Sequence, residues 1–202
     1  AGTSRRPTSR SAEPPAGASM ARIALLSDVH FGAHDPAVVE GVVADVHAFA
    51  PDVVVVSGDL TQRAKSEQFA QARAFLDRLG VIGEDLVVVP GNHDIPLYDL
   101  LRRATRPRER FRRFITTDRA PFVEAGGVAV LGLDTSRPEV WKNGELSSAD
   151  VREIRERLEA VPADVLKVVV THHPFVPPPG HPEARIVVGA RRALAAASDC
   201  GV

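Results

Sequence analysis

The sequence has few of the features that mark secreted or membrane-spanning proteins. Its 202 residues include a single cysteine, Cys200, so no disulfide can form within the chain. No apolar run approaches the roughly 20 residues that a membrane-spanning helix needs. The 25 Lys and Arg residues nearly balance the 26 Asp and Glu residues, so the net charge of −1 gives no general attraction to nucleic acid or anionic membranes. We therefore expect a reducing, cytoplasmic location and no membrane partner.

Residues 1–19 differ from the rest of the chain in composition. They are rich in Pro, Gly, Ser, Thr and Arg, and they contain neither a core-forming pattern nor the apolar centre of a signal peptide. We predict a disordered leader over residues 1–19 and one domain over residues 20–202. The only methionine, Met20, directly precedes the first strand-like run, which suggests the hypothesis that the natural chain starts there. N-terminal sequencing of the native protein tests it.

The first half of this domain alternates short apolar runs with longer amphipathic stretches. Strands are predicted at residues 22–27, 53–57 and 86–89, each bounded by Asp, Gly or Pro. Helices are predicted between them, at about residues 36–49 and 65–79. This β-α-β-α-β order indicates an α/β layered fold, with parallel neighbouring strands and right-handed connections.

The second half continues with further strands. Two of them are predicted at residues 121–125 and 128–133, with Gly126-Gly127 between them as a hairpin turn. A helix over about residues 148–160 precedes the last predicted strand, at residues 165–170. No internal repeat and no second domain is visible.

An arginine-rich segment separates the two halves. Residues 99–119 contain eight arginines and three acidic residues. Apolar Leu100, Leu101, Phe111 and Phe114 are spread through the segment, which predicts a surface helix with a solvated basic face. A patch that binds the substrate's phosphate is the alternative.

Polar side chains of metal-binding types follow four of the predicted strands. They are Asp28 and His30 after the first strand, Asp59 after the second, Asn92 and His93 after the third, and His172 and His173 after the strand at residues 165–170. Because the carboxyl ends of strands in an open α/β sheet converge on one crevice, we expect these groups to lie together. Carboxylate, imidazole and amide groups without thiolate suit Mn, Fe or Zn. A carboxylate such as Asp59 can bridge two ions about 3.5–4 Å apart.

Four short motifs contain these residues and occur in a recognisable order. They are DVH (28–30), GDLT (58–61), GNHD (91–94) and THHP (171–174). Their order resembles that of the calcineurin-like metallophosphoesterases, and the resemblance covers the chain from about Ala21 to its end. The segments LDTSRP (133–138) and NGELS (143–147) also look like the bacterial branch that includes class III 3′,5′-cyclic-nucleotide phosphodiesterases. The resemblance implies an α/β fold, a layered α-β-β-α sandwich.

The resemblance also implies ligands for two divalent metal ions (Mn, Fe or Zn). By similarity, Asp28 and His30 bind the first ion, and Asp59 bridges both ions. Asn92 and His172 bind the second ion. Taken singly, Asp28, Asp59 and Asn92 are also residue types that fix turns after strands, so their metal role depends on their occurring together.

Three further residues receive roles from the resemblance. His93 is similar to the family histidine that binds no metal but lies near the substrate, and it is the predicted catalytic residue. It would donate a proton to the leaving oxygen or stabilise charge on the phosphoryl group. Asp94 would orient His93, and His173 would support its neighbouring ligand or serve in packing.

The sequence departs from the family pattern near its end. The family pattern finishes with a further strand and a GH-x-H motif that completes the metal sites, whereas this sequence stops at residues 198–202 (SDCGV). GHPE (180–183) imitates the motif, but Glu183 replaces its second histidine, and we interpret the segment as a Pro-rich loop near the site. We expect an incomplete domain that binds metal weakly and has weak or no activity.

The activity implied is hydrolysis of a phosphodiester or phosphomonoester by attack of a metal-bridging hydroxide. The partner expected is a small phosphate ester or a nucleotide, with a cyclic nucleotide as the single substrate that we select. A non-catalytic interaction module on the same fold is one alternative. A DNA nuclease is another, against which the sequence shows no strong basic groove beyond residues 102–113.

Overall fold

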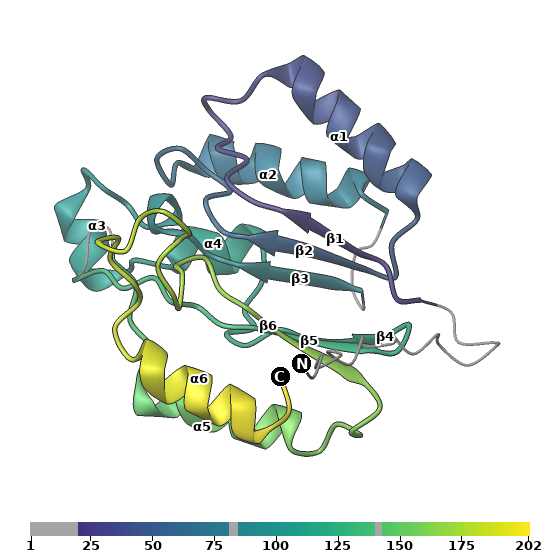
Figure 1. The fold of residues 1–202 in the computed structure, drawn as a ribbon. Coiled ribbons are helices and arrows are strands. Elements are labelled where there is room, and N and C mark those ends of the chain that lie inside the picture. Colours follow the sequence, from purple (N-terminus) through teal and green to yellow (C-terminus); the bar gives the residue numbers. More distant parts are fainter. Residues whose placement is uncertain (1–19, 81–84, 140–142) are drawn as a thin grey trace, which may run out of the picture.

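The computed structural model describes residues 20–80, 85–139 and 143–202. It has four layers, which run in Figure 1 from α1 and α2, through two sheets of three strands each, to α5 and α6. The predicted layered α-β-β-α sandwich is confirmed. The leader predicted at residues 1–19 lies outside the described residues. Within the described part of the chain, no helix has both the length and the apolar content to cross a membrane.

The first sheet is parallel and has the order β1-β2-β3. Its strands are β1 (Ile23–Leu26), β2 (Val53–Ser57) and β3 (Leu86–Val89), connected by α1 (Pro36–Phe49) and α2 (Ser66–Arg78). All five residues of β2 are buried, since this strand is central and covered on both faces. Alternate β2 side chains therefore contribute to different apolar clusters, one under the helices and one between the sheets.

The second sheet combines a hairpin with a parallel crossover. Strands β4 (Phe122–Ala125) and β5 (Val128–Gly132) pair antiparallel, and β6 (Leu166–Val170) pairs parallel with β5. The predicted hairpin turn is confirmed, with positive φ values of 59° and 83° at Gly126 and Gly127. Helix α5 (Ser148–Leu158) makes the crossover to β6.

The apolar core is divided by the two sheets into three clusters. The middle cluster lies between the sheets and consists mainly of valines, among them Val55, Val87 and Val130. Phe69 and Phe75 of α2 pack in the cluster under the first pair of helices. The third cluster lies between the second sheet and α5 and α6. This packing fixes the four strands whose carboxyl ends carry the site.

The prediction of one basic surface helix over residues 99–119 is wrong. The segment forms two short helices, α3 (Leu100–Thr105) and α4 (Glu109–Phe114), because Pro107 lies between them and cannot continue a helix. Some of its arginines also form hydrogen bonds inside the protein and do not face solvent. Arg103 is 5% exposed and donates to the carbonyl oxygens of Pro138 and Pro96, at 2.6 and 3.2 Å.

The chain ends in a helix that the sequence analysis did not predict. Helix α6 (Ala190–Asp199) packs alongside α5 below the second sheet (Figure 1). Its small residues Ala190, Ala193 and Ala197 recur at helical spacing and are buried in the third cluster. A run of alanines carries a weak apolar signal, so tertiary packing decides this helix.

Candidate metal centre

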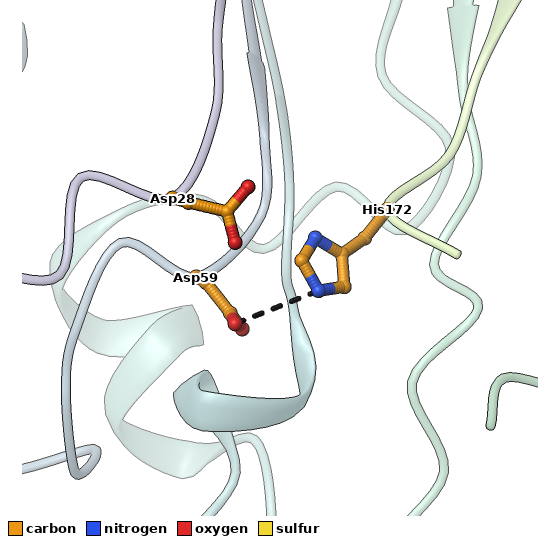
Figure 2. A group of neighbouring side chains, drawn as sticks. All are labelled: Asp28, Asp59 and His172. Carbon is orange, nitrogen blue, oxygen red and sulfur yellow. Dashed lines mark ion pairs between the residues drawn. The ribbon is translucent and has the colours of Figure 1, made fainter. Parts of the chain in front are cut away.

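Three potential metal ligands converge at the carboxyl ends of the strands. Asp28 follows β1, Asp59 follows β2 and His172 follows β6, and one ligand atom from each lies within 4.8 Å of the others. Figure 2 shows both carboxylates and the imidazole directed toward a common space. Carboxylate oxygen and imidazole nitrogen are ligands for borderline and hard divalent ions.

Unusual backbone conformations bring these side chains inward. Asp28, His30 and Asp59 have φ values of 56°, 50° and 51°, in the left-handed region that non-glycine residues seldom adopt. Each such residue costs on the order of 1–3 kcal/mol, and such strain clusters at functional sites. Three strained residues among the predicted ligands indicate that surrounding contacts hold this loop geometry in place.

The distances within the group fit shared metal ions better than hydrogen bonds. Nε2 of His30 lies 3.7 Å from Oδ1 of Asp28 and 3.8 Å from Oδ2 of Asp59. Nε2 of His172 lies 3.6 Å from the same Asp59 oxygen. These separations exceed those of hydrogen bonds, whereas two ligands about 2.1 Å from one ion lie roughly 3–4.2 Å apart, depending on the angle between them. Oδ2 of Asp59 thus lies near Nε2 of both histidines.

Hydrogen bonds set the tautomers of two histidines. Nδ1 of His172 lies 2.8 Å from the carbonyl oxygen of Ser57, so Nδ1 carries the proton and Nε2 presents its lone pair toward Asp59. Nδ1 of His93 lies 2.9 Å from the carbonyl oxygen of Gln62, which leaves its Nε2 for a ligand or a proton. The rings of His93 and His30 meet edge to face, with centroids 4.9 Å apart.

The ring of His173 lies edge to face against that of His172, with centroids 4.9 Å apart, and it is held by the second half of the fold. Its Nδ1 lies 2.7 Å from the hydroxyl oxygen of Thr135, in the LDTSRP segment, and the residue is 7% exposed. Burial lowers the pKa of His173 to about 4, and the neighbouring His172 lowers it further. The ring is therefore neutral near pH 7 and packs behind its neighbour.

Similarity to known proteins extends over most of the chain. The model of the calcineurin-like phosphoesterase family matches residues 21–196. The chain belongs to this family. A probable cyclic nucleotide phosphodiesterase of Rhodococcus erythropolis (strain PR4 / NBRC 100887) is 28% identical over 147 residues. The match covers 69% of this chain but 44% of the relative, so the chain spans less than half of that protein.

Asp94 forms hydrogen bonds with the loop that follows β2 and with the start of the loop that follows β3. Its buried carboxylate accepts hydrogen bonds from the backbone N–H groups of Gly91, Leu60 and Thr61 and from the Thr61 hydroxyl, at 2.9–3.1 Å. Burial raises the pKa of Asp94 to about 6, with a contribution from Asp59, although these hydrogen bonds favour the ionised form. The orienting contact that we expected Asp94 to make with the His93 ring comes instead from the Gln62 carbonyl.

Asn92 lies beside the site, whereas His181 lies on an exposed loop outside the ligand group. Asn92 begins the 3-10 turn Asn92–Asp94 directly after β3, beside His93. His181 is on a surface loop, its side chain 69% exposed and 3.5 Å from Glu183, and it is not part of the ligand group. This location agrees with our interpretation of GHPE as a Pro-rich loop.

The residues that position Asp28, His93 and His172 were not predicted from the sequence. Ser57 and Gln62 act through their backbone carbonyl oxygens. Every residue has such a group, so the residue type does not predict this contact. Ser27 donates its hydroxyl to the Asp28 carboxylate. Its position directly before a predicted ligand was the available signal for that contact.

Proposed function

We propose that this chain carries the two-metal centre of an enzyme that hydrolyses phosphodiesters or phosphomonoesters. The observation that carries the proposal is the spacing around Asp59, with a histidine nitrogen on each side at 3.6 and 3.8 Å. Family membership supports hydrolysis of phosphate esters. The relative named a probable cyclic nucleotide phosphodiesterase and the LDTSRP segment support a cyclic nucleotide as substrate.

In this proposal the residues of the site fall into two metal-binding sets that share one carboxylate. Asp28 and His30 would hold one ion, Asn92 and His172 would hold the other, and Asp59 would be shared by both. Bound divalent ions (Mn, Fe or Zn) supply positive charge that polarises the phosphoryl group and makes water more acidic. The residues themselves fix the positions of the charges before the substrate arrives.

His93 is the catalytic residue of the proposal. Its Nδ1 proton is directed at the Gln62 carbonyl, so Nε2 is the atom that can hold a transferable proton. We place the leaving oxygen of the ester beside this nitrogen, where a proton neutralises the charge that develops on that oxygen. Its backbone N–H donates to Oδ1 of Asp59 at 2.8 Å, which fixes the histidine relative to the bridging carboxylate.

Two further parts of the proposal concern the whole protein. We propose residues 20–202 as one catalytic domain and a cytoplasmic location, the latter on the single cysteine. Arg103, Arg108 and Arg110 donate to carbonyl groups inside the protein, which leaves fewer arginines of this segment for the nuclease alternative.

Metal titration and turnover of Mn²⁺-loaded protein test the proposal together. Asp59→Asn is expected to weaken Mn²⁺ binding, measured by calorimetry, by at least roughly tenfold. His93→Ala is expected to retain Mn²⁺ binding but to lower kcat for bis(p-nitrophenyl) phosphate by roughly 10²–10⁴-fold. His181→Ala, on the exposed loop, is the control and should change neither. Unchanged Mn²⁺ binding in Asp59→Asn, or a wild type that neither binds Mn²⁺ nor hydrolyses the ester, refutes the proposal.

A further inference from the structure

The loop that follows β2 carries an exposed arginine, Arg63, that contacts an exposed tyrosine, Tyr98, on the loop that follows β3. The guanidinium carbon of Arg63 lies 5.1 Å from the centroid of the Tyr98 ring. Tyr98 is the only tyrosine of the sequence and is 73% exposed, and Arg63 is exposed as well. An aromatic ring with one face against a cation and most of its surface open to solvent can receive a planar ligand on the other face.

This pair has a fixed relation to the candidate metal centre. Arg63 directly follows Gln62, whose carbonyl oxygen lies 2.9 Å from Nδ1 of His93. Tyr98 lies five residues beyond His93, on the same loop. Asp94 accepts hydrogen bonds from the loop that carries Arg63 and from the loop that carries Tyr98. The pair therefore lies on two loops that are hydrogen-bonded to each other, one of which also carries His93.

The charge of Arg63 is not used in the protein's own ion pairs. Across residues 20–80, 85–139 and 143–202, no carboxylate forms an ion pair with Arg63. Arg108 and Arg137 differ, since they pair with Asp134 and Asp150. The N–H donors of a guanidinium lie in its own plane, so a guanidinium over an aromatic ring can still donate at its edge to a phosphate or a base.

We propose that Arg63 and Tyr98 form a specificity site for the aromatic part of the substrate, an inference that rests on the proposed function. The ligand class is a phosphate ester whose alcohol carries a nucleobase or an aryl ring. Tyr98 stacks on that ring, and Arg63 holds Tyr98 in place and donates to the ester. Because the leaving oxygen is placed beside His93, the pair meets the leaving group.

Steady-state kinetics with two esters test the proposal. Mn²⁺-loaded protein is assayed with bis(p-nitrophenyl) phosphate, an aryl ester, and with glycerophosphoethanolamine, an aliphatic one. Base stacking on an aromatic side chain corresponds to roughly a 5- to 150-fold change in affinity. Tyr98→Ala should raise KM for the aryl ester by an amount in this range, with kcat unchanged and the aliphatic ester unaffected. Arg63→Ala should act in the same direction.

Two control variants separate stacking from general disturbance of the loop. Tyr98→Phe retains the ring and should behave like the wild type. Leu101→Ala removes a neighbouring side chain that is 76% exposed, and it should change neither ester. Calorimetric titration with adenosine 5′-monophosphate adds a readout that needs no turnover, and Tyr98→Ala should weaken this binding by the same factor.

The outcomes distinguish this inference from the proposed function. Active wild type with equal losses for both esters in Tyr98→Ala, or with unchanged affinity for adenosine 5′-monophosphate, overturns the specificity site and leaves the hydrolase standing. Wild type that binds this nucleotide through Tyr98 but hydrolyses neither ester supports the site and refutes the hydrolase. Wild type that neither hydrolyses an ester nor binds the nucleotide overturns both.

Discussion

Replacing Gly91 by alanine should damage the metal centre through a steric contact alone. Gly91 precedes Asn92 and has φ −99° and ψ −176°, an extended conformation that alanine also adopts. The substitution therefore causes no backbone strain at this position. A Cβ atom there would lie 2.0 Å from Oδ1 of Asp59 and 2.3 Å from its backbone nitrogen. The nearest atoms to this Cβ thus all belong to Asp59, the proposed bridging residue.

The size of the effect follows from these distances. Cβ contacts in proteins essentially never fall below 3.0 Å, so one of the two loops must move by roughly 1 Å. Overpacking of this kind costs about 1–3 kcal/mol of unfolding free energy, equivalent to roughly 2–12 °C in Tm for a chain of this length. Displacing a residue that binds or supports a metal lowers metal affinity by roughly 10–100-fold.

A matched glycine in α1 provides the control. Gly41→Ala meets no atom within 4 Å and should instead stabilise the helix by about 0.5–1 kcal/mol. Calorimetric Mn²⁺ titration and thermal unfolding of both variants decide the matter. Wild-type Mn²⁺ affinity and Tm in Gly91→Ala would show that the loop carrying Asp59 yields freely, and the argument from close packing would fail.

Three further changes test the surroundings of the site. Thr61→Val removes the hydroxyl that donates to Asp94 at 2.9 Å, and it should lower the free energy of unfolding in urea by about 1–3 kcal/mol. A decrease below about 0.5 kcal/mol would contradict the role of this contact. Arg108→Met leaves Asp134, whose side chain is 16% exposed, without its ionic partner, and should cost about 3 kcal/mol, with partial recovery in the double variant that adds Asp134→Asn. Since the pKa of His173 is lowered to about 4, the unfolded chain binds the additional proton between pH 6.5 and 4, and metal-free protein should lose up to about 3 kcal/mol of stability as pH falls through this window. The difference in pH dependence between wild type and His173→Asn isolates this effect from Asp94, whose raised pKa acts in the opposite direction, and identical profiles would refute it.

The sequence predicted those parts of the fold that depend on local apolar pattern. The valine run at residues 53–57 forms β2, and Gly126-Gly127 forms the hairpin turn. The site residues were predictable for a related reason, because polar groups directly after strands collect at one edge of a sheet. Asp28, Asp59 and His172 meet there as that reasoning requires.

The parts that sequence did not predict depend on distant contacts. Whether an arginine faces solvent or a buried carbonyl is decided by groups far along the chain, such as Pro138 for Arg103. Helix α6 consists largely of alanines that fit against α5, and composition alone does not predict that fit. The Asp94 carboxylate bonds mainly to backbone groups, so its partners could not be read from residue types.

These backbone contacts explain how strained ligand loops are held in place. The left-handed conformations of Asp28, His30 and Asp59 are unfavourable, yet His30 N donates to Asp59 O at 2.9 Å and Asp28 N to Gly58 O at 3.2 Å. Asp94 adds bonds from the β2 loop to the β3 loop. Each net bond contributes about 0.5–1.5 kcal/mol, so a handful offsets strain of a few kcal/mol. These backbone hydrogen bonds therefore stabilise the positions of Asp28, His30 and Asp59 at the carboxyl ends of the strands.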